Sequence, residues 1–189
     1  MISCSTNNEH SRVEPNLKTP KTNIDSNKTD IKTPETNIQT NTDKFITERL
    51  PEEFTELPKE IIADLEKRKC RIPQTWTLDN KKTNVIEGEF KKKGQKDAAV
   101  LCFDGSTNAI LIYWDKALKE VSKIYEQQGN DDRIIEIADA KYIYQHAEWY
   151  DGPKPPKINH HGINDIIPEK ASTVHYLHKG KWLELQGAD

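Results

Sequence analysis

Aromatic residues are missing from the first part of this sequence. Between residues 5 and 44 there is none, and the only aliphatic residues are Val13, Leu17, Ile24, Ile31 and Ile38. A stretch with so few apolar residues cannot bury enough apolar surface to offset the conformational entropy that it would lose on folding. Its six acidic and six basic residues balance, which argues against a tail that acts through charge alone. We therefore predict a head and disordered linker over residues 1–44 and a single globular domain over residues 45–189.

The sequence also lacks a strong excess of one charge and the motifs of several large enzyme classes. The formal net charge is −3 and no basic stripe interleaved with aromatic residues is present, so we expect no nucleic-acid partner. HExxH, GxSxG, the P-loop and the dinucleotide-binding glycine pattern are all absent. We expect no cofactor. Whether the protein is an enzyme stays open, with a non-catalytic role favoured.

Cysteine is scarce, with only Cys4, Cys70 and Cys102. The last two are 32 positions apart and the sequence has no CxxC, so they do not have the spacing of a zinc site. Two alternatives stay open for this pair. In an exported protein the two residues can form a disulfide, whereas otherwise they are buried free thiols that pack as small hydrophobic groups.

The pattern of residues 45–189 predicts an α+β fold, mainly antiparallel sheet, with one N-terminal helix. The helix is expected over residues 57–70, with Thr55 as a candidate N-cap and an apolar stripe through Ile61 and Leu65. The continuous apolar runs at 98–103 and 109–114 are typical of strands buried on both faces. With the alternating run at 84–90 they predict an antiparallel meander of three strands.

The second half of the domain is harder to assign. Residues 115–129 fit a helix that begins at Asp115 and ends at Gly129, or a strand because Val121 and Tyr125 alternate with polar residues; we favour the helix. Residues 133–137 and 141–144 are expected to be strands. A C-terminal hairpin is expected from residues 171–177 and 181–185.

The first five residues, MISCS, resemble the end of a bacterial lipoprotein signal, the lipobox. The resemblance implies a diacylglycerol on the sulfur of Cys4, cleavage before Cys4, and a membrane partner reached through the lipid. Two or more acyl chains anchor a protein stably, at about 0.8 kcal/mol per buried CH₂. The implied location is the cell envelope. The alternative is a cytoplasmic protein in which Cys4 is a lone cysteine.

Two further resemblances concern the domain. Residues 89–101, EFKKKGQKDAAVL, look like the strand–loop–strand of FG-GAP or VCBS repeats, whose aspartate-rich loop binds calcium. Here Asp97 is the only acid in the loop, so calcium binding is not expected. The segments 65–74, 84–90, 94–102, 169–176 and 180–189 resemble a family of uncharacterised, exported bacterial proteins. That resemblance implies export and a shared fold, names no activity, and favours a disulfide between Cys70 and Cys102.

The best candidate for a reactive site is the stretch NHHGIND at residues 159–165. His160 and Asp165, with His175 or His178, could bind a metal or transfer protons, because histidine titrates near neutrality. The more ordinary alternative, which we favour, is a polar loop that satisfies backbone groups. No metal site is therefore assigned, and His160, Asp165 and His175 are weak candidates only.

The aromatic stretch at residues 142–150 allows two interpretations. On a strand, Tyr142 and Tyr144 share a face and could form a platform for a ligand, but such residues more often belong to the core. Two functions follow from the sequence. One is a lipid-anchored envelope protein with a non-catalytic binding or structural domain, and the other is an envelope metal-assisted hydrolase centred on His160 and Asp165.

Overall fold

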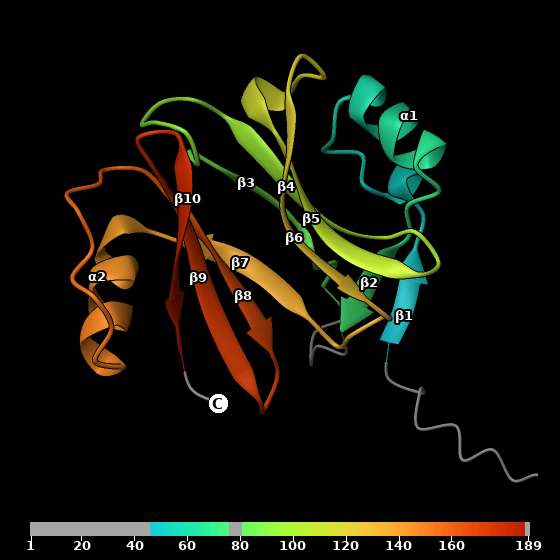
Figure 1. The fold of residues 1–189 in the computed structure, drawn as a ribbon. Coiled ribbons are helices and arrows are strands. Elements are labelled where there is room, and N and C mark those ends of the chain that lie inside the picture. Colours follow the sequence, from blue (N-terminus) through green and yellow to red (C-terminus); the bar gives the residue numbers. More distant parts are fainter. Residues whose placement is uncertain (1–45, 76–80, 188–189) are drawn as a thin grey trace, which may run out of the picture. The chain divides into compact units, whose positions relative to one another are not determined.

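A computed structural model describes residues 46–75 and 81–187 (Figure 1). The chain divides into two units, 1–39 and 40–189, and every described residue belongs to the second. The predictions for the linker and Cys4 lie outside the described residues. The described elements are strands β1 (Ile46–Arg49), β2 (Ile72–Thr75), β3 (Val85–Gly88), β4 (Asp97–Phe103), β5 (Thr107–Tyr113), β6 (Val121–Gln128), β7 (Ile134–Ala138), β8 (Gly162–Ile167), β9 (Ala171–His178) and β10 (Lys181–Gln186), helices α1 (Lys59–Lys67) and α2 (Ala140–Trp149), and 3-10 turns η1 (Pro51–Glu53) and η2 (Trp114–Lys116).

The strands form two four-stranded antiparallel sheets and one small antiparallel pair. The first sheet has the order β3-β4-β5-β6, the second has the order β10-β9-β8-β7, and β1 pairs with β2. The α+β expectation, mainly antiparallel, is confirmed at this level. The predicted meander is confirmed too, and β6 extends it by a fourth strand.

Three clusters of buried side chains define the layers of this unit. The α1 core lies between α1 and one face of the first sheet, and contains Ile61, Leu65, Val100 and Leu111. The inter-sheet core joins the other face of the first sheet to the second sheet, as Leu101 and Ile112 pack with Ile163 and Leu177. The α2 core lies between the far face of the second sheet and α2. The layers therefore run α1, first sheet, second sheet, α2 (Figure 1).

The first helix is shorter than the sequence predicted. It begins at Lys59 because Pro58 occupies the N-cap, and Thr55 caps nothing. It ends in a Schellman motif, in which the Cys70 N–H donates to the Leu65 carbonyl (2.9 Å) and the Lys69 N–H to the Glu66 carbonyl (2.8 Å). Lys69 takes the left-handed conformation (φ 58°) that this motif requires. The motif turns Cys70 back into the α1 core.

The helix expected over residues 115–129 is wrong, because residues 121–128 form the edge strand β6. Asp115 and Lys116 both have positive φ, which ends regular structure before a helix can begin. The following residues then pair antiparallel with β5. Ladder hydrogen bonds to a buried neighbour outweighed a weak local helical pattern, which is the usual way in which tertiary context overrides propensity.

The strand expected at residues 141–144 is also wrong, and with it the expectation of a single helix. Asp139 caps α2, since its carboxylate accepts the Tyr142 N–H at 2.7 Å. Ile143, His146 and Ala147 are buried at helical spacing against the second sheet. On this helix Tyr142 and Tyr144 do not share a face as they would on a strand, so the strand-based platform is lost.

The C-terminal hairpin is confirmed. β9 and β10 pair with His178 opposite Lys181, and the two-residue turn between them holds Lys179 (φ 50°) and Gly180 (φ 77°). Two consecutive positive φ values are the mark of a type I′ turn, which suits the twist of the flanking strands. The stretch expected to be a polar loop at 159–165 instead runs into strand β8, which lies between β7 and β9.

Candidate functional site

A group of charged and polar side chains lies between the two sheets, next to the inter-sheet core. We call it the inter-sheet polar cluster; its members are Tyr125, Arg133, Asp165, His175 and Glu184, and they line a cavity of about 180 Å³. Arg133, Asp165 and His175 are buried. Charged residues are almost never fully buried unless they are paired, so these three need a structural or a functional explanation.

Strand alternation places the buried members of the cluster. Side chains two positions apart on a strand share a face. Asp165 is two residues after Ile163 on β8, and His175 is two residues before Leu177 on β9. Ile163 and Leu177 both belong to the inter-sheet core, so Asp165 and His175 also point toward the first sheet. The register places Glu184 on β10 directly opposite His175.

Arg133 forms the fixed end of the cluster. One of its guanidinium nitrogens donates to Asp165 Oδ2, and the other donates to the Tyr125 hydroxyl at 2.7 Å. The guanidinium carbon lies 4.2 Å from the centroid of the Tyr125 ring. Asp131 adds a longer contact of 3.7 Å. Burial raises the pKa of Tyr125, so its hydroxyl stays protonated near neutrality.

His175 links the buried carboxylate to an exposed one. Its Nε2 lies 3.5 Å from Asp165 Oδ2, and its Nδ1 lies 3.3 Å from Glu184 Oε1. The Glu184 side chain is 51% exposed, whereas those of His175 and Asp165 are at most 3% exposed. Within the described part of the chain, both ring nitrogens and Asp165 Oδ1 have no partner at hydrogen-bond geometry.

The cluster is a row in which guanidinium, carboxylate, imidazole and carboxylate follow one another. The two terminal nitrogens of Arg133 are held by Asp165 and Tyr125, and its charge is balanced by the Asp165 carboxylate. No described hydroxyl or thiol is hydrogen-bonded to His175, so no nucleophile is activated there. Within residues 46–75 and 81–187, no group of three metal-ligating side chains is close enough to hold a metal ion. The arrangement therefore holds strands together and borders a small polar cavity.

The structure brings together only some of the residues singled out from the sequence. Asp165 and His175 meet, as described above. His160 does not join them: it lines a different cavity, with His178, and its Nδ1 lies 3.0 Å from the His161 carbonyl oxygen. The reason is that His160 precedes β8, whereas Asp165 lies well inside that strand.

Arg133 and Glu184 were not identified from the sequence as members of any site. Arg133 lies two residues before Ile135, a residue of the inter-sheet core. Side chains two positions apart on an extended segment share a face, so this spacing is a signal for an inward-facing basic residue. Nothing in the sequence around Glu184 indicates that it belongs to a site. Its position beside His175 is set by the pairing of β9 with β10.

The resemblance to calcium-binding repeats can be compared with the loop between β3 and β4. The two strands do form an antiparallel pair. Asp97, at the start of β4, is fully buried and its carboxylate accepts hydrogen bonds from the Lys91 N–H (3.0 Å), the Gln95 amide (2.6 Å) and the Asp115 N–H (2.8 Å). This carboxylate closes the loop.

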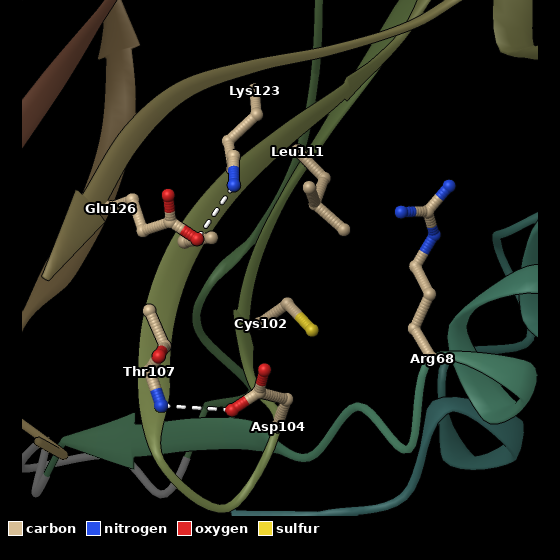
Figure 2. A pocket seen from close by; sticks show the side chains of 8 residues that line it. Arg68, Cys102, Asp104, Thr107, Leu111, Lys123 and Glu126 are labelled. Atoms are coloured by element: carbon tan, nitrogen blue, oxygen red, sulfur yellow. Dashed lines mark hydrogen bonds and ion pairs between the residues drawn. The ribbon is translucent and has the colours of Figure 1, made fainter. Parts of the chain in front are cut away.

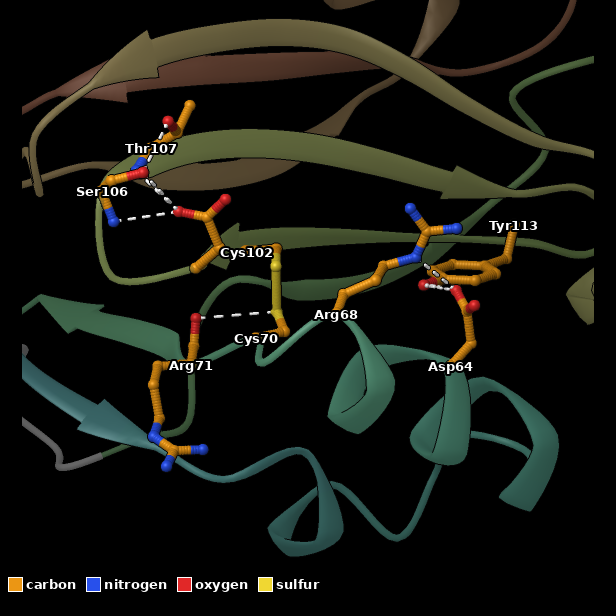
Figure 3. The surroundings of a disulfide bond; sticks show 9 residues. Asp64, Arg68, Cys70, Arg71, Cys102, Ser106, Thr107 and Tyr113 are labelled. Atoms are coloured by element: carbon orange, nitrogen blue, oxygen red, sulfur yellow. Dashed lines mark hydrogen bonds and ion pairs between the residues drawn. A yellow bond between two sulfur atoms is a disulfide. The ribbon is translucent and has the colours of Figure 1, made fainter.

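Cys70 and Cys102 lie at disulfide-bonding distance, with their Cα atoms 5.3 Å apart (Figure 3). Cys70 follows α1 and Cys102 lies on β4, so the pair connects the helix layer to the first sheet. This geometry supports the disulfide alternative over two separate thiols.

A second cavity, of about 240 Å³, lies beside Cys102 (Figure 2). Its charged groups are already paired: Lys123 with Glu126 at 2.6 Å, and Arg68 with Asp64 at 2.6 Å. Asp104 accepts the Ser106 and Thr107 N–H groups, which hold the pKa of its carboxyl below the usual value. Each charged side chain of this cavity is therefore already held by an ion pair or by backbone N–H groups.

A scan against protein-family models matched none, and searches of curated proteins and of solved structures found no match. No helix among the described residues is long and apolar enough to cross a membrane.

Proposed function

We propose that this chain is a lipid-anchored protein of the bacterial cell envelope, held to the membrane through Cys4, whose folded part is a non-catalytic binding or structural domain. The sequence supports the anchor through the lipobox-like start and the polar stretch that follows it. A lipid at Cys4 and a long polar tether would hold the folded part away from the bilayer surface.

The observation that carries the proposal is the disulfide-distance pair of Cys70 and Cys102. Disulfides persist in oxidising compartments such as the periplasm and the cell surface, and are rare in the bacterial cytosol. The pair is buried within the α1 core, with Cys70 fully buried and Cys102 5% exposed. A structural link at this place favours an exported domain over a cytoplasmic one.

A non-catalytic role is supported by the inter-sheet polar cluster. Its ionisable groups contact one another, and the buried Arg133 is held by a carboxylate and a hydroxyl. The alternative hydrolase centred on His160 and Asp165 lacks support from the geometry, because these two residues line different cavities.

Metabolic labelling with an alkyne fatty acid tests the anchor. The full chain is expressed from its own gene in its bacterial host, as wild type, as Cys4→Ala and as the neighbouring control Ser5→Ala. We expect label on the wild type and on Ser5→Ala, both in the membrane fraction, and none on Cys4→Ala. A wild-type protein without label in the cytosolic fraction would overturn the proposal, as would label retained by Cys4→Ala.

A further inference from the structure

A cavity of about 280 Å³ at one end of the two sheets has a strongly basic lining. Its basic members come from three separate parts of the chain, and we call the set the basic pocket: Lys91, Lys157, His160, His178 and Lys179. The other lining residues are Ile158, Asn159, Leu177 and Gly180, so no acidic residue lines it. This is unexpected in a chain whose formal net charge is −3.

Two loops that contribute to the basic pocket are fixed to each other. The Glu89 N–H donates to His161 Nδ1 at 3.0 Å, and the His161 N–H donates to the Glu89 carbonyl at 3.0 Å. The Lys91 N–H is held in turn by the buried carboxylate of Asp97. The backbone that carries Lys91 is therefore anchored beside the segment that carries Lys157 and His160.

Aromatic packing connects the third part, the turn between β9 and β10. Trp182, on β10, stacks on Trp114 with ring centroids 6.0 Å apart. The Lys91 ammonium lies 5.2 Å from the centroid of the Trp114 ring. Leu177, which lines the pocket, packs in the inter-sheet core. The basic groups thus converge on a preformed framework, which reduces the entropy lost on binding.

Most of the positive charge in the basic pocket is uncompensated. Lys91 pairs with the exposed Glu120 at 3.3 Å. Among the residues that the structure describes, Lys157 and Lys179 have no ion-pair partner within 4.0 Å, and both are exposed. Two ammonium groups without a carboxylate partner, at a cavity that Lys91 also lines, favour an anion with several acceptor oxygens, and phosphate is a common ligand of lysine.

We propose that the basic pocket binds a phosphate ester. The cavity is larger than one phosphate group, so the ligand carries a small organic group beside its phosphate, as a glycerol phosphate or a phospholipid headgroup does. Lysine ammonium groups supply the charge, and the buried His160 and half-buried His178 supply ring nitrogens at the wall. The inference rests on the binding role in the proposed function and does not depend on the lipid at Cys4.

Calorimetric titration of the full, unlipidated chain with glycerol 3-phosphate tests this inference. The test variant is Lys157→Gln with Lys179→Gln, and the matched control is Lys67→Gln with Lys141→Gln, two exposed lysines outside the pocket that change the net charge equally. We expect the test variant to weaken binding about tenfold or more, which corresponds to about 1.4 kcal/mol, and the control about twofold or less.

Two results would overturn the inference. One is no detectable binding of glycerol 3-phosphate by the wild type at concentrations up to about 10 mM. The other is equal weakening in the test and control variants, which would show only a general effect of charge. Both variants change exposed side chains, and a circular dichroism melt of each checks that it folds.

Vesicles separate the two sources of phosphate. Sedimentation with phosphatidylglycerol vesicles, and with phosphatidylcholine vesicles as reference, compares a membrane headgroup with the free ester. Binding to the anionic vesicles that glycerol 3-phosphate displaces identifies a headgroup site, and binding to the free ester alone identifies a soluble ligand. Failure of all these titrations would leave labelling at Cys4 unaffected, so the inference and the anchor fail separately.

Discussion

The second sheet buries one histidine on each of its faces, and the two have different surroundings. His175 faces the first sheet between two carboxylates, those of Asp165 and Glu184. His146, from α2, packs on the opposite face and is 1% exposed. Both ring nitrogens of His146 lack a hydrogen-bond partner among the described residues. Its ring contacts aromatic neighbours, with the Tyr150 centroid 4.9 Å away.

The comparison shows two ways of burying an ionisable ring. Around His146 only burial acts, and it lowers the pKa of the imidazole from its usual 6.5, so the neutral ring is favoured. Around His175 the sheet places a carboxylate on each side of the ring. The face toward the first sheet therefore combines an apolar core with a row of ionisable side chains. The face toward α2 combines apolar contacts, a hydrogen bond from the Asn164 amide to the Tyr142 hydroxyl, and a neutral imidazole.

Asp165→Ala should have the largest effect on this comparison. It removes the carboxylate between Arg133 and His175 and leaves the buried guanidinium with the Tyr125 hydroxyl and the longer contact to Asp131. We expect the free energy of unfolding to fall by about 3–5 kcal/mol, the usual loss when one partner of a buried ion pair is removed. Urea denaturation measures it. Glu136→Ala, at an exposed position on β7, serves as control and should change stability by about 0.5 kcal/mol or less. A loss from Asp165→Ala as small as the control's would show that the charged row contributes nothing.

Ile143→Val tests the apolar side of the comparison. Ile143 is fully buried between α2 and the second sheet. Removing one methyl group there should lower the free energy of unfolding by about 0.5–1.5 kcal/mol. Ile137→Val on β7 is the matched control, because Ile137 is 44% exposed. If both variants lower the free energy of unfolding by the same amount, α2 does not shield this face of the sheet from water.

The pH dependence of stability should report on His146. Because its pKa is lowered in the folded state, the unfolded chain takes up a proton first as the pH falls below about 6.5. This histidine therefore contributes stability above pH 6.5 that is lost as the pH falls toward its folded pKa. Between pH 7.5 and pH 5, the free energy of unfolding should fall less for His146→Leu than for the wild type. The difference between the two should equal the contribution of this one histidine, whose pKa differs between the folded and unfolded states. Parallel pH profiles of thermal unfolding for the two proteins would contradict the neutral, unpartnered state of His146.

Glu184→Gln should have the smallest effect. The Glu184 carboxylate is half exposed and water screens its contact with His175. Exposed ion pairs contribute about 0.2–1 kcal/mol, and we expect a loss in that range by urea denaturation. A loss equal to that of Asp165→Ala would mean that the outer carboxylate stabilises the row as strongly as the buried one.

The parts of the fold with strong local signals were predictable from the sequence. The runs at 98–103 and 109–114 are unbroken and apolar, and they became the buried strands β4 and β5. The turn at Lys179 and Gly180 placed the last hairpin correctly.

The errors occurred where local signals were weak. β6 has a mixed pattern, and its pairing with β5 decided its structure. α2 was missed although Ile143, His146 and Ala147 show helical spacing, because the short apolar run at 141–144 suggested a strand.

The candidate site was only half predictable. Asp165 and His175 were recognised as titratable residues, but their meeting depends on the register of β8 with β9. Arg133 comes from the segment before β7 and Glu184 from β10, and no local pattern in the sequence connects the two. The basic pocket was hidden for the same reason, because three distant loops form it.

The proposed function depends on export of the protein to the oxidising envelope. Counting the free cysteine thiols of the protein in its host cells tests this export directly. Cells of the native host are quenched in acid, denatured, and treated with a maleimide-linked polymer that adds mass to each free cysteine. The chain has three cysteines. A lipid on Cys4 and a disulfide between Cys70 and Cys102 predict no added polymer before reduction and two after it. Three additions before reduction would contradict the lipid anchor, the disulfide and the envelope location together.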